Sequence, residues 1–218
     1  AMARTAQRTS VPVALHLDHG HTYEGVMKAV RWGFTSVMFD GSALSLADNL
    51  KKTKEITRIA HSLGISVEGE LGYIGQNDSL AGIVPEEPIT AEIAAEFVTK
   101  TKIDALAVSV GTNHGKVKLT GGLNIMRLAE LNNLVDVPLV LHGGSKLSRE
   151  DCRLVIDNGI SKINIATDMS LSAAERLKTE LAKAPTANYI HLMTSVKKGV
   201  KDLVRKYMLN FDCISRAI

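Results

Sequence analysis

Three histidines in this chain each end an apolar, strand-like run and lie beside a glycine or another polar residue. They are His19 in VPVALHLDHG, His114 in ALAVSVGTNHG and His142 in VPLVLHGGS. Three imidazoles can form a catalytic zinc site, because the fourth coordination position stays open for water or substrate. Their wide spacing means that the fold, and no local motif, must bring them together at the ends of strands.

The segment from His16 to Gly20 (HLDHG) is the densest group of candidate residues. Neighbouring residues of a regular strand point to opposite faces, so Asp18 and His19 converge only if the strand ends there, and Gly20 permits such a turn. His16 shares a face with Asp18 and could orient that carboxylate or support a metal site. A buried, hydrogen-bonded His/Asp group is the alternative, and the two other strand-end histidines argue against it.

Flexible backbone suited to holding an anion follows two of these histidines. Glycines let backbone N–H groups approach a phosphate, and consecutive N–H groups form a nest for it. A helix that begins after the last apolar run offers further N–H groups at its N-terminus. The candidate phosphate contacts are therefore Gly115, then Gly143, Gly144 and Ser145, and finally Asn164, Ile165, Ala166 and Thr167.

Length and composition limit the kind of protein this is. The 218 residues suffice for one well-buried domain, and an aromatic content of 4% predicts an aliphatic core. A net charge of +3 suits anionic small substrates and is too weak to indicate nucleic acid binding. No apolar run of the sequence approaches the roughly 18 residues of a membrane span. Cys152 and Cys213 lie far apart without a CxxC pattern, so we expect reduced thiols in a cytoplasmic protein.

The elements that must position the candidate residues are apolar, β-branched runs that alternate with helical patterns. Most runs are continuously apolar, which is typical of parallel strands covered on both faces. Six βα units in series predict an α/β barrel or a doubly wound sheet. The predicted strands span 11–17, 35–39, 65–71, 104–110, 137–141 and 162–166.

Several helices have recognisable starts. Ser45 with Asp48 predicts the start of a helix over 46–63, and Ser148 with Asp151 repeats this pattern. Thr22 is expected to cap a third helix. After the last strand the sequence predicts a helix over 172–184 and then a longer amphipathic helix, an element that often packs on a partner subunit.

A (β/α)₈ barrel requires eight strands and typically about 250 residues, whereas six strands are predicted here. Either the chain folds as a six-stranded open sheet, or the first two βα units of a barrel are missing from it. A partner chain could also complete such a barrel.

Six motifs decide between these possibilities by resemblance. In order they are HLDHG, VMFDGS, VEGELGYIG, VSVGTNHG, LVLHGGS and INIATD. They resemble the class II, zinc-dependent ketose-bisphosphate aldolases, which include fructose- and tagatose-bisphosphate aldolases, from Val11 to the C-terminus. The resemblance implies a TIM (β/α)₈ barrel without its first two βα units, as a single domain over 1–218, followed by C-terminal helices.

The resemblance also implies roles for individual residues. His19, His114 and His142 correspond to the family's zinc ligands, and Asp18 corresponds to its catalytic carboxylate. The glycine-rich segments named above correspond to those that hold the phosphate of dihydroxyacetone phosphate. The implied reaction is reversible cleavage of a ketose 1,6-bisphosphate to dihydroxyacetone phosphate and an aldehyde phosphate, which makes the protein a carbon–carbon lyase.

Three further acidic residues receive roles from the same resemblance. Asp78 aligns with a glutamate that serves the family as a second acid on a loop, although its side chain is one methylene shorter. Asp40 and Glu70 correspond to strand-end positions where some members bind a second cation, monovalent or divalent. A buried supporting role for Asp40 and Glu70 is equally consistent with their positions.

Two alternatives stay open. The chain could be an aldolase for another phosphorylated keto sugar, because the aldehyde half of the substrate would be recognised by loops and by the missing βα units, on which the motifs carry no information. It could also be a catalytically weak paralogue, or a partner subunit of an active aldolase, because the loop over 75–79 is altered. The expected partners are a phosphorylated sugar and further copies of the chain in a homodimer or homotetramer, with neither nucleic acid nor membrane.

Overall fold

The structure is a computed structural model that describes residues 2–71, 89–110, 123–145 and 147–214. Strands and helices alternate along these ranges. The strands are β1 (His16–Gly20), β2 (Ser36–Phe39), β3 (Ser66–Leu71), β4 (Ala105–Val108), β5 (Leu139–Leu141) and β6 (Ile160–Ile163). The helices are α1 (Met2–Ala6), α2 (Tyr23–Arg31), α3 (Leu46–Ser62), α4 (Ala91–Thr101), α5 (Ile125–Leu134), α6 (Arg149–Asp157), α7 (Thr167–Lys183) and α8 (Tyr189–Asn210).

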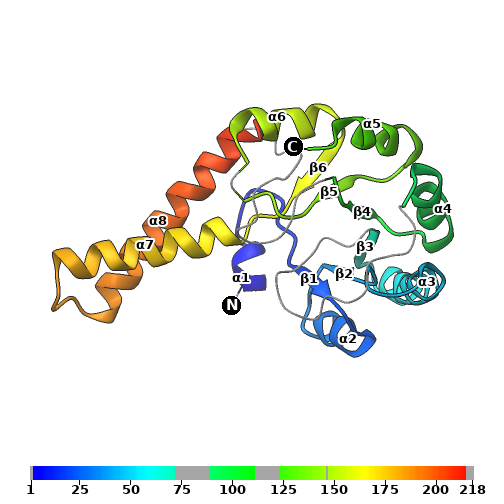
Figure 1. Cartoon of the computed structure of the whole chain (residues 1–218). Coiled ribbons are helices and arrows are strands. Elements are labelled where there is room, and N and C mark those ends of the chain that lie inside the picture. The colour runs from blue at the N-terminus through cyan, green and yellow to red at the C-terminus, as the bar shows by residue number, and fades with distance from the viewer. Residues whose placement is uncertain (1, 72–88, 111–122, 146, 215–218) are drawn as a thin grey trace.

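The six strands form one parallel sheet in the order β1-β2-β3-β4-β5-β6, so each pairs with its neighbours in sequence. The sheet is curled, and α2 to α6 surround its outer side (Figure 1). Because all strands run in the same direction, the loops that follow them gather at one end of the curl. The predicted α/β fold class is thus confirmed, and the six described strands form a half-barrel. The two further strands of the expected eight are not among the described residues.

Alternate residues of each strand face opposite sides of the sheet. The outer face packs against the helices and forms the main apolar core, which includes Val37, Phe39, Leu106, Leu139 and Leu141. On the inner face, Met38, Ala107 and Val140 form a separate small cluster. The strand register aligns Glu70 with Ala107, and Val140 with Lys162, so charged side chains share the inner face with this cluster.

The predicted bounds of the first and last strands are wrong. The first was expected over 11–17, but β1 begins at His16 and continues to Gly20. Val11 and Val13 are half exposed, and Pro12 between them has no N–H group for a sheet. The last strand was expected over 162–166, but β6 ends at Ile163, so the segment 164–166 forms a loop.

The predicted helix caps are confirmed. Thr22 and Ser45 accept hydrogen bonds from backbone N–H groups in the first turns of α2 and α3. Ser148 and Asp151 form a reciprocal capping box at the start of α6. The helix expected over 172–184 instead begins at Thr167. Asp168 in its first turn bonds to Ser145 and to Tyr207, and such contacts between distant residues leave no local pattern in the sequence.

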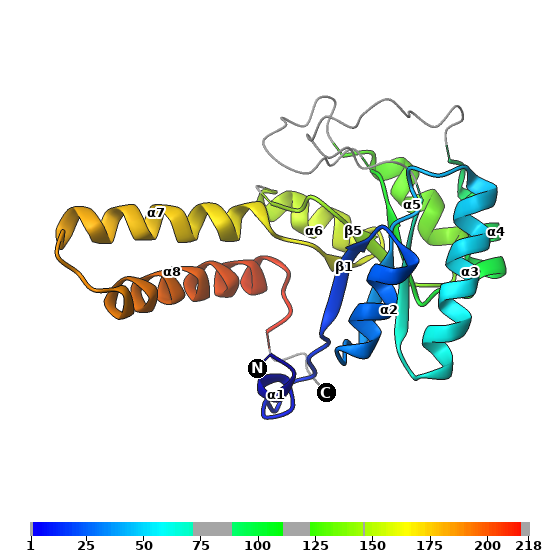
Figure 2. The same ribbon diagram turned by 90° about the horizontal axis from the view of Figure 1, so that it is seen from below.

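Helices α7 and α8 pack against each other as an arm that projects away from the half-barrel (Figures 1 and 2). Among the described residues of both helices, only Tyr207 is buried. Its ring lies 5.6 Å from that of Phe211, and its hydroxyl donates to the carboxylate of Asp168 in the first turn of α7. No described helix, in the arm or elsewhere, is long and apolar enough to cross a membrane.

Replacing Tyr207 with Ala should loosen the arm. The loss of a buried ring and a hydrogen bond should lower the free energy of unfolding by about 3 kcal/mol. Amide hydrogen exchange should accelerate in α7 and α8 more than in the strands. Tyr189→Ala is the matched control, because this tyrosine is 74% exposed at the start of α8; it should change stability by less than about 0.5 kcal/mol. Equal effects of the two substitutions would contradict the anchoring role.

Candidate active site

The end of β1 is distorted in a way that brings Asp18 and His19 together. The register with β2 shifts between Leu17 and Gly20, and His19 has φ 52°, a left-handed conformation that is rare outside glycine. Asp18 Oδ1 consequently lies 3.9 Å from His19 Nε2. The convergence was expected from a turn at Gly20, but Gly20 stays in the strand. A Cβ there would lie 2.6 Å from the carbonyl oxygen of Met38, so this glycine permits close packing instead.

His19 and His142 meet across the open end of the half-barrel. His142 follows β5 and is fully buried, and its Nδ1 lies 3.0 Å from Nε2 of His19. The two rings are nearly perpendicular, with centroids 4.8 Å apart. Ligand atoms of Asp18, His19 and His142 all lie within 4.8 Å of one another, so the three side chains can serve a single metal ion.

A buried carboxylate holds the other nitrogen of each histidine. Asp40 Oδ2 lies 2.7 Å from His19 Nδ1, and Glu68 Oε1 lies 2.9 Å from His142 Nε2. Each carboxylate accepts an N–H, so in the neutral rings the two facing nitrogens carry lone pairs. Two lone pairs at this distance repel each other unless a proton or a metal ion lies between them. Carboxylate–histidine pairs of this kind orient metal ligands, and the donor set therefore fits zinc.

The charges at this point favour a cation. Burial disfavours the charged form of His19, but its hydrogen bond to Asp40 and the negative charges of Asp18, Asp40 and Glu68 outweigh that effect and raise its pKa. Burial would likewise raise the pKa of Asp40, but hydrogen bonds from His19 and Ser42 lower it to about 2. Asp40 therefore remains ionised, and the negative charge that attracts a cation is permanent at neutral pH.

Asp40 and Glu70, the candidate ligands of a second cation, both lie beside His19. Asp40 accepts hydrogen bonds from His19 and from the backbone and hydroxyl of Ser42. Glu70 is 1% exposed, and its Oε2 lies 3.8 Å from His19 Nδ1. His21, which we expected at most at the mouth of the pocket, is largely exposed and has its Nδ1 3.4 Å from Asp40. The contacts of Asp40 are those of a residue that supports His19.

His16 supports the histidine pair indirectly. Its Nδ1 bonds to the hydroxyl of Ser36, and its Nε2 lies 3.6 Å from Glu68 Oε2. These contacts join His16 to Glu68, the carboxylate that holds His142. Burial outweighs the attraction of Glu68 and lowers the pKa of His16, so the ring is neutral at pH 7.

Glu68 and Lys162 are site residues that the sequence reasoning missed. Glu68 is 2% exposed and pairs with His142 through one oxygen and with Lys162 through the other. A signal for Glu68 was present, because Glu68 and Glu70 alternate in an otherwise apolar strand and must therefore share its inner face. For Lys162 the sequence carries no comparable signal, since a lysine near the end of a strand is usually solvated.

The two candidate phosphate segments lie together. The N–H of Gly144 donates to the carbonyl of Asn164, which joins the loops after β5 and β6. A Cβ at Gly144 would lie 2.3 Å from Ile163, so only glycine fits here. Ser145 Oγ accepts from the N–H of Asp168 in the first turn of α7. The structure therefore brings Gly143, Gly144 and Ser145 beside Asn164, Ile165, Ala166 and Thr167.

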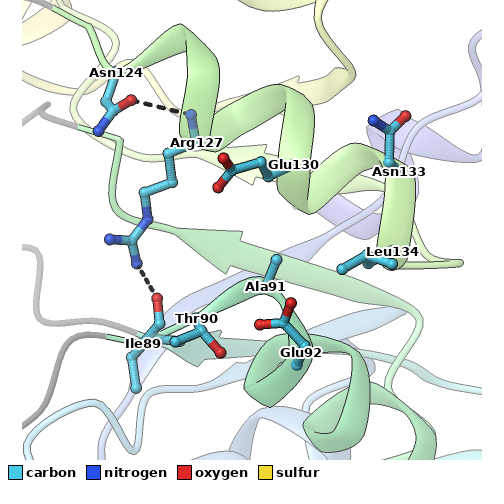
Figure 3. Close-up of a pocket in the computed structure, with 9 residues that line it drawn as sticks. All are labelled: Ile89, Thr90, Ala91, Glu92, Asn124, Arg127, Glu130, Asn133 and Leu134. Atoms are coloured by element: carbon cyan, nitrogen blue, oxygen red, sulfur yellow. Dashed lines mark hydrogen bonds between the residues drawn. The ribbon is translucent and has the colours of Figure 1, made fainter.

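Three of the expected site residues, His114, Gly115 and Asp78, lie outside the described residues. A pocket of about 520 Å³ lies elsewhere, between the start of α4 and the length of α5 (Figure 3). Arg127 spans it and donates to the carbonyl of Ile89, which ties the two helices together. Its lining contains none of the expected site residues.

Comparison with known proteins identifies the family of this chain. The family described as fructose-bisphosphate aldolase class-II matches residues 1–216. The chain belongs to this family. It is 40% identical over 199 residues to a sulfofructosephosphate aldolase of Alkalicoccus urumqiensis, across 90% of this chain and 69% of the relative. As a class II aldolase, the chain is a carbon–carbon lyase.

Solved structures support the same assignment. The YdjI aldolase of Escherichia coli K12 is 33% identical and superposes with a TM-score of 0.83, over 100% of this chain and 75% of that one. The fructose-bisphosphate aldolase of Campylobacter jejuni is 23% identical, with a TM-score of 0.79 over 97% of this chain and 73% of that one, and shows the fold alone. The class II aldolase half-barrel described above is thus shared with longer relatives.

Replacing Glu68 with Gln should weaken metal binding. The substitution keeps the side-chain volume but removes the charge that holds the N–H of His142, and losses of this kind typically reduce metal affinity by roughly 10- to 100-fold. Zinc affinity can be measured by competition with a chromophoric chelator, with circular dichroism as the check on folding. Glu55→Gln, on the exposed side of α3, is the control and should bind zinc as the unmodified chain does. Unchanged zinc affinity in the Glu68 variant would contradict the supporting role.

Proposed function

We propose that this class II aldolase is zinc-dependent and reversibly cleaves a ketose 1,6-bisphosphate of the fructose or tagatose type. The products are dihydroxyacetone phosphate and an aldehyde phosphate. The observation that carries the proposal is the meeting of His19 and His142 at 3.0 Å, with Asp18 beside them and the glycine-rich loops next to them. A metal ligand pair, a proton carrier and an anion cradle are the parts that aldol cleavage of a sugar phosphate requires.

His19 and His142 would hold the zinc, together with His114, which lies outside the described residues. The family is generally zinc-dependent, and the carboxylate-oriented imidazoles fit that metal. When bound, zinc supplies a Lewis acid for the negative charge that develops on the ketone side of the breaking bond.

Asp18 would act as the general base in cleavage and take the proton of the C4 hydroxyl. Its side chain is half exposed, so substrate can reach it, and Asn164 Nδ2 donates to its Oδ1 at 3.1 Å. This hydrogen bond fixes the carboxylate while leaving its second oxygen for the substrate hydroxyl. The acid that completes the reaction would be Asp78, which lies outside the described residues.

The loops after β5 and β6 would hold the phosphate of dihydroxyacetone phosphate. Gly143, with φ 67°, would present its backbone N–H group without a side chain in the way, whereas the N–H of Gly144 joins the two loops by donating to Asn164. The start of α7 at Thr167 adds further N–H groups, and its N-cap residue Ala166 makes no side-chain cap. Gly115 would extend the cradle from outside the described residues.

For Asp40 and Glu70 we propose the supporting role. The hydrogen bonds of Asp40 to His19 and Ser42 occupy both of its oxygens, which leaves less capacity for a second cation. We therefore expect the zinc-loaded protein to need no monovalent or second divalent cation for its activity.

A second candidate substrate is favoured by the 40% identity to a sulfofructosephosphate aldolase. By its name, such a ketose carries a sulfo group besides its phosphate, and both groups are tetrahedral oxyanions. The cradle and the histidine pair would serve either ketose alike, because they act on the phosphate end and on the breaking bond. Another phosphorylated keto sugar, or a catalytically weak subunit, are the remaining alternatives.

We also propose that the half-barrel corresponds to six strands of a (β/α)₈ barrel in a single domain, and that the protein is a homodimer or homotetramer. The parallel curl and the greater length of the related structures support the barrel. The exposed apolar side chains of the arm, such as Leu171, Leu181 and Ile190, support an interface between copies.

A coupled cleavage assay with a panel of ketose phosphates tests the substrate. We expect cleavage of fructose or tagatose 1,6-bisphosphate that is lost with a chelator and restored by zinc. The panel should include sulfofructose phosphate, and faster cleavage of that compound would replace the bisphosphate assignment. A zinc-loaded protein that cleaves no member of the panel would support the inactive-subunit alternative.

Substitutions separate the metal site from the base. His142→Ala should remove zinc and activity together, because it deletes a ligand. Asp18→Ala should retain zinc but lower kcat by roughly 100- to 10,000-fold, which is the usual contribution of general acid–base catalysis. His191→Ala, an exposed histidine of α8, is the control and should change neither property. Loss of zinc from the Asp18 variant would show that Asp18 is a metal ligand.

A further inference from the structure

Lys162 lies on the inner face of β6 and touches both halves of the candidate active site. Its Nζ donates to Asn164 Oδ1 at 2.7 Å and lies 2.9 Å from Glu68 Oε2. Asn164 in turn donates to Asp18, and Glu68 accepts from His142. The ammonium group of Lys162 therefore contacts both Asn164, which binds the proposed base, and Glu68, which binds the proposed metal ligand His142.

The contact with Asn164 decides which way its side-chain amide faces. An ammonium group only donates hydrogen bonds, so the amide atom facing Lys162 must be the oxygen. The amide nitrogen then faces Asp18 Oδ1 at 3.1 Å, where it donates to the carboxylate. If the amide turned over, its oxygen would face the Asp18 carboxylate, and the two acceptors would repel each other. Lys162, which only donates, and Asp18, which only accepts, therefore both favour the orientation in which Asn164 supports the base; the amide nitrogen also lies 3.2 Å from His142 Nε2.

The contact with Glu68 serves the other half of the site. Glu68 is 2% exposed, and a buried carboxylate needs partners for both oxygens. One oxygen accepts from His142 Nε2, and the other pairs with Lys162. With Lys162 in place, Glu68 keeps one oxygen directed at His142.

We propose that Lys162 is a positioning residue of the aldolase reaction. It orients the Asn164 amide so that Asp18 is held as the base, and it keeps Glu68 on His142. This inference rests on the proposed role of Asp18, but the orientation of Asn164 is a property of the folded chain whether or not the reaction is the one proposed.

A double-mutant cycle tests the link through Asn164. Lys162→Met should lower kcat about tenfold or more, the size expected for a lost hydrogen bond to a charged group, while KM changes less than about threefold. Lys162→Arg keeps a donor and should recover part of kcat. With zinc in excess, so that the contact through Glu68 affects metal affinity and not kcat, Lys162→Met in an Asn164→Ala background should cost less than about twofold further in kcat. Fully additive losses, or an unchanged kcat in Lys162→Met, would overturn the proposal.

A second comparison separates positioning from a general structural role. In Lys162→Met, Glu68 is left charged and poorly paired, whereas Glu68→Gln combined with Lys162→Met removes that charge. Stability, measured by urea unfolding, should recover in the double variant, but kcat should stay below that of Glu68→Gln alone. Recovery of kcat together with stability would overturn the proposal. Lys197→Met, on the exposed side of α8, is the matched control and should change neither property.

A readout without turnover keeps this inference independent of the proposed function. The side-chain amide signals of Asn164 in ¹H–¹⁵N spectra should shift in Lys162→Met and stay unchanged in Lys197→Met. A shift in a protein that cleaves no ketose phosphate would leave the positioning intact and refute only the proposed function. Unshifted Asn164 signals in Lys162→Met would refute the positioning.

Discussion

The approach of His19 Nε2 and His142 Nδ1 to 3.0 Å is the contact on which the rest of the site depends. Two neutral imidazoles that face each other with lone pairs repel, so this contact needs a proton or a metal ion between the rings, and carboxylates that keep the rings in place. Asp40 and Glu68 keep the two rings in place by hydrogen bonds. Asp40 in turn accepts a hydrogen bond from Ser42, and Glu68 pairs with Lys162. These polar groups of the half-barrel thus form one network, and its buried members, Glu68 and His142, depend on their neighbours because burial keeps water from replacing those contacts.

The curled parallel sheet can hold such a polar network because the two faces of the sheet have different surroundings. The outer face packs aliphatic side chains against the helices, and these contacts form most of the apolar core. The inner face carries only a small apolar cluster beside buried acids and a fully buried histidine. Because the strands are parallel, their ends meet at one edge, and residues far apart in sequence, such as Asp18 and Asn164, become direct neighbours.

Much of the fold was predictable, because its signals are local. The caps at Thr22, Ser45 and Ser148 are confirmed, since a side chain and an N–H group three residues later are enough to form them. The bounds of β1 and the start of α7 were wrong, since sheet pairing and contacts with Ser145 set them. Of the site, the meeting of His19 and His142 was expected from their positions at strand ends, whereas His114 and Asp78 lie outside the described residues.

The sequence by itself determined the order of strands and helices, the family, and the set of strand-end histidines, glycines and acids that can do the chemistry. The tertiary structure alone decided how these groups are oriented. The left-handed turn at His19, the buried carboxylate of Glu68 behind His142 and the ammonium group of Lys162 behind Asn164 depend on neighbouring strands. The physical reason is that hydrogen bonding between distant residues is fixed by sheet register and burial, which periodicity along one strand does not encode.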